Sequence, residues 1–185
     1  MSVGWMLFVE GGEDKAFLDS LLDHLDVANV STVEIGGGVS KLQKIKPNLS
    51  RALDSGNRIA VILDADSDFS NRRDEFLKCK NQFGLPIDRF FLLPDHKTSG
   101  CLETLLEQMA VPSHRGIYKC FDKYKTCLWD RGNPYCLPKP KARIYAYCEA
   151  LGIETRGTER SYEDSLYWDL DVPELEPLKQ FLYDL

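Results

Sequence analysis

The sequence lacks a long apolar run. No stretch of its 185 residues approaches the roughly 20 consecutive apolar residues that a membrane-spanning helix requires. The apolar segment 5–9 is short and ends at Glu10, with no basic flank before it and no small-residue cleavage site after it. These absences argue against a membrane protein and against a secretory signal. We therefore expect a cytoplasmic protein that makes no membrane contact.

The sequence also lacks Cys-x-x-Cys pairs, which most structural zinc sites use. Its cysteine count is even, but a chain of 185 residues with 43 % hydrophobic residues can build a core without a disulfide framework. We therefore expect reduced thiols that pack as small apolar side chains. The six residues are Cys79, Cys101, Cys120, Cys127, Cys136 and Cys148.

Internal repeats and low-complexity tracts are missing as well. The share of charged residues, 28 %, is ordinary for a globular protein and argues against wholesale disorder. A chain of this length can bury one good core. We expect a core domain over residues 1–111 and an extension over residues 112–185 that packs on it.

A net positive charge is absent too, because the chain carries −6. This acidity speaks against a nucleic-acid partner, but the charge is unevenly distributed. Residues 115–147 hold eight basic and two acidic side chains, whereas the segments before and after them are acidic. One concentrated basic segment keeps a phosphate-bearing partner open. Its basic residues are Arg115, Lys119, Lys123, Lys125, Arg131, Lys139, Lys141 and Arg143.

Short apolar strands alternate with amphipathic helices over the first 110 residues. We expect strands at residues 5–10, 31–35, 58–63 and 88–93, helices between them and a further helix over 102–109. A kink or break at Pro47 is expected in the second helix. This order predicts an α/β protein with an open parallel sheet of about four strands and helices on both faces. After residue 111 the pattern weakens, and further helices are expected near residues 141–151 and after Pro173.

Acidic side chains stand where two of these strands end. Glu10 follows the first strand, and Asp64 and Asp66 follow the third. Ligands of open α/β sheets bind beyond the carboxyl ends of the strands. Positions i and i+2 of a strand point the same way, so Asp64 and Asp66 project together if the strand continues that far. Asp14, four residues after Glu10, faces the same cleft if the helix has begun. Converging carboxylates repel one another, and a hard cation such as Mg²⁺ or Mn²⁺ resolves this repulsion.

Other interpretations of the segment 64–68 remain open. Asp66 or Asp68 is also typical of a helix cap or a turn. A calcium loop of the EF-hand type would use the three aspartates and Glu75, but Phe69 occupies the position that needs glycine and a strand precedes the loop. A haloacid-dehalogenase-type phosphatase places Asp-x-Asp after the first strand, whereas here it follows the third. A receiver domain needs an acidic pair on the first strand, where this chain has Glu10 alone.

The chain resembles the Toprim domain, which topoisomerases, bacterial primases, recombination-mediator proteins and OLD-family nucleases share. The resemblance rests on Phe-Val-Glu-Gly at residues 8–11, on Val-Ile-Leu-Asp-Ala-Asp at residues 61–66 and on the β/α order between them. It covers about residues 5–110. With its length and the glycines at 36–38, the chain looks most like small stand-alone Toprim-like proteins of prokaryotes, many of which have no assigned function.

The resemblance implies roles for individual residues. Glu10 would be a metal ligand or general acid/base, and Asp64 and Asp66 would hold Mg²⁺. Asp14 matches the position where OLD-like nucleases place an acid for a second metal, and Glu103 lies near where they supply another carboxylate. Glu103 is equally typical of an ordinary first helical turn. The chain carries no identifiable DNA-cleaving tyrosine domain, which argues against strand passage and priming.

The basic segment 115–147 also holds seven aromatic side chains. Cations neutralise phosphates and aromatic faces stack on bases, so this composition suits nucleic-acid binding. A small subdomain with an aromatic core and solvated lysines is the alternative. Lys141 or Arg143, near the start of a helix, would stabilise charge in phosphoryl transfer if it reaches the active site.

Three functional hypotheses follow. The first is a Mg²⁺-dependent enzyme that cleaves phosphodiester bonds of DNA or RNA, with Glu10, Asp64, Asp66 and Lys141 as its catalytic residues. The second is a non-catalytic Toprim-like subunit beside an ATPase, which would have to come from a partner because the chain has no GxxxxGK[ST] motif. The third is a phosphohydrolase that acts on small nucleotides.

Overall fold

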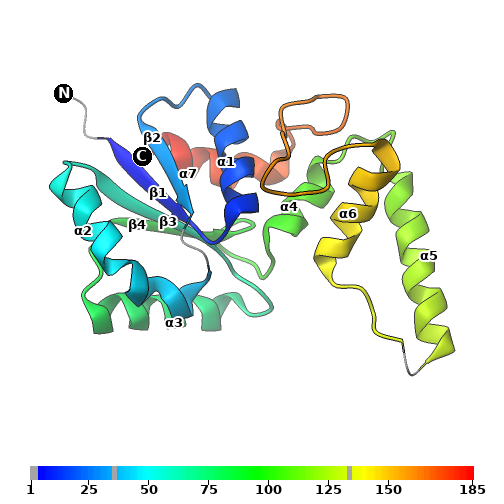
Figure 1. The fold of residues 1–185 in the computed structure, drawn as a ribbon, viewed down its shortest axis with the longest axis horizontal. Coiled ribbons are helices and arrows are strands. Elements are labelled where there is room, and N and C mark those ends of the chain that lie inside the picture. Colours follow the sequence, from blue (N-terminus) through cyan, green and yellow to red (C-terminus); the bar gives the residue numbers. More distant parts are fainter. Residues whose placement is uncertain (1–3, 35–36, 133–134) are drawn as a thin grey trace.

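Four parallel strands form one open sheet at the centre of the computed structural model, which describes residues 4–34, 37–132 and 135–185. Their order across the sheet is β2-β1-β3-β4 (Figure 1). The prediction of an open parallel α/β fold is therefore confirmed. The strands are β1 (Trp5–Val9), β2 (Val30–Glu34), β3 (Arg58–Asp64) and β4 (Arg89–Leu93).

Helices connect the strands and build the C-terminal part. None of the helices in the described part of the chain is long and apolar enough to cross a membrane. The α-helices are α1 (Gly12–His24), α2 (Lys46–Asp54), α3 (Phe69–Phe83), α4 (Leu102–Met109), α5 (Gly116–Arg131), α6 (Pro140–Leu151) and α7 (Glu176–Tyr183), and the 3₁₀ helices are η1 (Val39–Ile45) and η2 (Pro173–Leu175).

Alternate residues of the central strands face two separate hydrophobic clusters. Leu7 and Ile62 face the larger cluster, to which α1, α4, α6 and α7 contribute. Phe8 and Val61 face the smaller cluster, which η1, α2 and α3 cover. Figure 1 shows α1 on one side of the sheet and α2 and α3 on the other. Because both faces are covered, the central strands read as continuous apolar runs.

The C-terminal extension contributes to the larger cluster. Tyr147, Trp168 and Leu178 are buried there together with β1, α1 and α4. An isolated bridge pairs Ala110 with Trp168 and ties the two segments together. The extension thus packs on the core, while a domain boundary at residue 111 stays a prediction.

Local breaks follow from particular residues. The expected break at Pro47 appears as a change of helix type, since 3₁₀ helix η1 ends at Ile45 and α2 begins with Pro47 in its first turn. Proline suits that position because the first amides of a helix have no acceptor within it. Of the glycines at 36–38, residue 36 lies outside the described residues.

The cysteines are all free, but the expectation that they pack as small apolar side chains holds fully only for Cys148, which is buried. Cys79 and Cys101 are half-buried. The expectation is wrong for the three cysteines of α5 and of the segment after it, because these side chains are exposed to solvent. These exposed thiols are Cys120, Cys127 and Cys136.

Candidate functional site

Four carboxylates gather at the carboxyl edge of the two central strands. Glu10 directly follows β1, and Asp64 is the last residue of β3. Asp14 lies in the first turn of α1 and Glu103 in the first turn of α4. Because β1 and β3 pair in parallel, with Val9 opposite Ile62, their acidic ends meet at the same edge. We call these four residues the carboxylate cluster.

Burial and mutual repulsion raise the pKa of two members. The pKa of Asp64 rises to about 8 through burial first, and then through the charges of Asp14, Glu10 and Glu103. The pKa of Asp14 rises to about 7 through burial, with Glu10 the strongest neighbouring charge and Glu103 a weaker one. Asp14 and Asp64 are thus each within electrostatic reach of the other three carboxylates.

The backbone holds the ends of this cluster in place. The Leu102 amide donates a hydrogen bond of 3.0 Å to Asp64 Oδ1, which joins the end of β3 to the start of α4. The Gly37 amide donates to the Glu10 carbonyl at 2.7 Å. A Cβ at Gly38 would lie only 2.7 Å from Glu10 Oε1, so glycine there lets the backbone approach that carboxylate.

The chemistry of these donors suits a hard cation. All are carboxylates, and Glu10 Oε2 is buried without a hydrogen-bond partner. An unpaired buried oxygen of this kind is costly, and a cation would satisfy it. Within residues 4–34, 37–132 and 135–185, no group of three or more His, Cys, Asp or Glu side chains is already arranged as a ligand set. The donors therefore fit Mg²⁺ or Mn²⁺ in kind, and their side chains would have to turn inward to bind it.

Asp66 does not project together with Asp64. The condition for that expectation is not met, because β3 ends at Asp64 and Asp66 has a positive φ of 55°. Its carboxylate forms an ion pair with Arg72 of α3, and Arg72 Nε also donates to the Asp64 carbonyl at 3.1 Å. Asp66 nevertheless lines a pocket of about 750 Å³ together with Glu103. It stands at the rim of the site.

Asp68 acts as the cap of α3. Its Oδ1 accepts a hydrogen bond of 3.0 Å from the Asn71 amide, so the alternative interpretation of this residue is confirmed. Glu75 contacts Asn71 and Arg72 on the same helix. Because both acids serve α3 and strand β3 precedes them, the segment does not form an EF-hand loop.

Sequence reasoning missed a buried ionic network beside the cluster. Glu13 accepts a hydrogen bond of 2.9 Å from Arg160 Nη1 and also forms an ion pair with Lys141. Arg160, which has no exposed side-chain surface, also donates to the Tyr162 hydroxyl and to the carbonyls of residues 154 and 155. No local pattern points to this pair, since 147 positions separate Glu13 from Arg160.

Lys141 lies next to the cluster, but Glu13 is its direct partner. Burial alone would lower the pKa of Lys141. The hydrogen bond to Glu13 and the charge of Glu13, with smaller contributions from Tyr145 and Glu103, together outweigh that effect and raise the pKa. The side chain is 46 % exposed. Its ammonium therefore adds positive charge at the border between the cluster and solvent.

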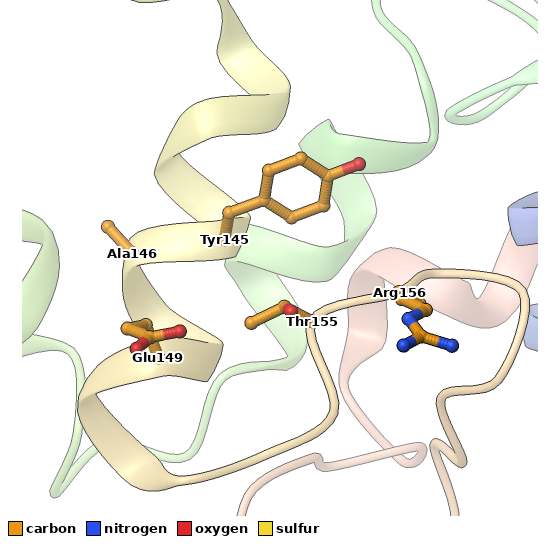
Figure 2. Close-up of a pocket in the computed structure, with 5 residues that line it drawn as sticks. All are labelled: Tyr145, Ala146, Glu149, Thr155 and Arg156. Carbon is orange, nitrogen blue, oxygen red and sulfur yellow. The ribbon is translucent and has the colours of Figure 1, made fainter.

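A second hollow lies apart from the cluster. Figure 2 shows it between α6 and the loop that follows, with Tyr145 pointing toward the side of that loop and Arg156 beyond it. Its volume is about 550 Å³, and Ala146, Glu149 and Thr155 complete its lining. Arg156 Nη1 donates a hydrogen bond of 3.0 Å to Glu159 Oε1. None of the residues that line the hollow belongs to the carboxylate cluster.

Fold and site together define an open parallel α/β protein with an acidic cluster at the carboxyl edge of its sheet. A family model described as "Protein of unknown function (DUF3226)" matches residues 4–185, and the chain belongs to this family. Comparisons with curated proteins and with solved structures gave no match. The resemblance to Toprim domains stays a prediction from the sequence.

Proposed function

We propose that this protein is a Mg²⁺- or Mn²⁺-dependent enzyme that cleaves phosphodiester bonds of nucleic acid. The carboxylate cluster carries the proposal, because Glu10, Asp14, Asp64 and Glu103 gather at the sheet edge where open α/β proteins bind ligands. Perturbed carboxylates of this kind concentrate at functional sites.

The cluster supplies the ligands that the proposed cation needs. Glu10, Asp14, Asp64 and Glu103 would hold it, and Asp66 would stay at the rim, paired with Arg72. A bound cation would polarise a phosphate and activate water. Without it, Asp14 and Asp64 hold protons near neutral pH, since burial and repulsion raise the pKa of Asp14 to about 7 and that of Asp64 to about 8.

Groups that suit a phosphate border the cluster on its open side. Lys141, whose side chain is 46 % exposed and whose ammonium pairs with Glu13, brings a positive charge within electrostatic reach of Glu103. Ser67 and Thr104 line the 750 Å³ pocket together with Asp66 and Glu103, and their hydroxyls can donate to phosphate oxygens. Negative ligands on one side and positive or donating groups on the other are the combination that phosphoryl transfer uses.

A nuclease assay tests this proposal directly. Single-stranded and duplex DNA and RNA are incubated with the protein in Mg²⁺, in Mn²⁺ and in EDTA. We expect cleavage that EDTA and Asp64→Asn both abolish. Asp54→Asn, an exposed acid at the end of α2, is the matched control and should keep wild-type activity. Cleavage that survives both EDTA and Asp64→Asn would contradict the metal mechanism.

Calorimetry with Mn²⁺ tests the site without relying on turnover. Glu10→Gln and Asp64→Asn should each weaken Mn²⁺ binding, and Asp54→Asn should not. If neither cluster variant weakens binding, the carboxylate cluster is not the cation site. Binding without cleavage of any nucleic acid would favour the non-catalytic subunit, and cleavage of small nucleotides alone would favour the phosphohydrolase.

A further inference from the structure

Helix α5 has its most buried side chain in its first half. Of its 16 residues, Tyr118 is the one that is buried. Tyr118 stacks on Tyr147 of α6 with ring centroids 5.2 Å apart, and Arg143 of α6 reaches Asp122 at 2.9 Å. These contacts hold the two helices side by side as a hairpin (Figure 1). The second half of α5 extends beyond them.

Large aromatic side chains stand in solvent on that projecting part. Trp129 is 71 % exposed, Tyr135 in the following segment 54 % and Tyr124 53 %. Exposing an indole to this degree forgoes the favourable burial that usually holds tryptophan inside a protein. We call residues 123–132 and 135–139 the hairpin tip.

The hairpin tip is also positively charged. Its four basic residues outnumber its single acid, Asp130. In a net acidic chain this local excess is a surface complementary to an anion rather than to the rest of the protein. It also disfavours pairing of two tips in a dimer, since like charges would face each other. The basic residues are Lys123, Lys125, Arg131 and Lys139.

The tip leads back to the pocket that Glu103 of the carboxylate cluster lines. Figure 1 shows α5 and α6 at the end of the molecule away from α2, with the far end of α5 pointing away from the sheet. The tip ends at Lys139, and the next residue, Pro140, lines the 750 Å³ pocket together with Asp66 and Glu103. A strand held on the tip thus has a short path into that pocket.

We propose that the hairpin tip binds single-stranded nucleic acid and delivers it to the carboxylate cluster. The inference rests on the proposed function for the delivery, but the binding itself requires neither cation nor cleavage. Trp129, Tyr124 and Tyr135 offer faces on which unpaired bases stack, while the basic residues neutralise the backbone. Bases inside a duplex are already stacked on one another, so the aromatic faces select single strands.

Trp129 reports on this binding through its own fluorescence. Of the three tryptophans, Trp5 is 3 % and Trp168 1 % exposed, so an added ligand reaches only Trp129. In EDTA, oligo(dT) and oligo(U) should quench the emission, and duplex DNA of the same length should quench it far less. Trp129→Phe should remove the response. Quenching that is equal for duplex and single strands would overturn the preference for single strands.

Variants separate stacking from charge. Trp129→Ala with Tyr135→Ala should weaken oligo(dT) binding about tenfold or more, measured by fluorescence anisotropy with a labelled oligonucleotide. Lys123→Ala with Arg131→Ala should reduce the slope of log K against log salt by about 1.4. The controls are Tyr183→Ala, an equally exposed aromatic on α7, and Lys78→Ala, an exposed base on α3. Unchanged binding in both tip variants would overturn the proposal.

The remaining outcomes are equally decisive. Light scattering that shows a dimer lost in Trp129→Ala would make the tip an interface between copies and would also overturn the proposal. Binding in EDTA by Asp64→Asn, without cleavage by the wild type in any metal, would uphold the tip and reject the nuclease. Metal-dependent cleavage by the wild type, with binding that the tip variants do not weaken, would uphold the nuclease and reject the tip.

Discussion

Glu13 and Asp14 are neighbours in the first turn of α1, yet they lie in opposite surroundings. Glu13 is buried against Arg160 and Lys141, which neutralise it. Asp14 faces Glu10, Asp64 and Glu103, so burial and like charges raise its pKa to about 7. The same helical turn therefore joins a satisfied ionic network to an unsatisfied carboxylate cluster.

This difference separates a role in stability from the role that we propose for the cluster. A buried acid with an arginine partner needs nothing further and fixes the segments that it joins. Here it fastens α1 to the segment around Arg160 and to the start of α6. A group of half-buried acids that mainly face other acids weakens the fold, and such groups concentrate at functional sites. Pairing is therefore a better guide to function than burial alone.

The largest effect on stability is expected from breaking the buried ionic network of Glu13 and Arg160. Arg160→Met leaves Glu13 buried with only the partly exposed Lys141 as partner, so we expect a loss of about 3–5 kcal/mol in the free energy of unfolding. Urea denaturation measures it. Arg156→Met removes a neighbouring arginine that is 73 % exposed, and should cost less than about 1 kcal/mol. Equal losses would show that the buried pair has no special role. Glu13→Gln added to Arg160→Met should restore part of the loss.

The contrast between these neighbours also shows which contacts a sequence pattern encodes. Continuous apolar runs such as Val61–Leu63 predict buried parallel strands, and the carboxyl ends of such strands meet at one edge. The sequence pattern alone therefore predicts that Glu10 and Asp64 share that edge. The pairing of Glu13 with Arg160 depends on how a distant loop folds back, which no local spacing encodes.

Two further features depend on tertiary context. Asp66 leaves the strand direction because the chain turns at a positive φ and Arg72 binds the carboxylate. Helix α5 has no counterpart among the elements predicted from the sequence, because only Tyr118 is buried along its length and the apolar periodicity that marks a packed helix is weak.

The pH dependence of stability tests the mutual repulsion within the carboxylate cluster. Burial and like charges raise the pKa of Asp14 to about 7 and that of Asp64 to about 8. Between pH 5 and pH 8 the folded protein therefore holds protons that the unfolded chain has already released. The free energy of unfolding should therefore fall by several kcal/mol as pH rises through this range. Denaturation in EDTA at several pH values measures this, and Asp64→Asn should flatten the curve. A curve that rises with pH would contradict the repulsion.

A cation should reverse that instability. At pH 8 and at a concentration 100 times its Kd, Mn²⁺ should raise the free energy of unfolding by about 2.7 kcal/mol through binding to the folded state alone. Asp64→Asn should lose most of this gain, and Arg156→Met, outside the cluster, should keep it. Thermal shift with and without Mn²⁺ measures both. The same gain in Asp64→Asn would place the cation elsewhere.

The smallest expected effect concerns Asp66, which stands between the two kinds of surroundings. The Toprim resemblance makes it a metal ligand, whereas the structure pairs its carboxylate with Arg72 at the rim. If Asp66 stays paired with Arg72 when Mn²⁺ binds, it supplies no ligand, so Asp66→Asn should weaken Mn²⁺ binding by no more than about threefold. Calorimetry on Asp66→Asn beside Asp64→Asn measures the difference. If both variants lose affinity equally, Asp66 must leave Arg72 to join the cluster, and Arg72→Met should then strengthen Mn²⁺ binding by freeing that carboxylate.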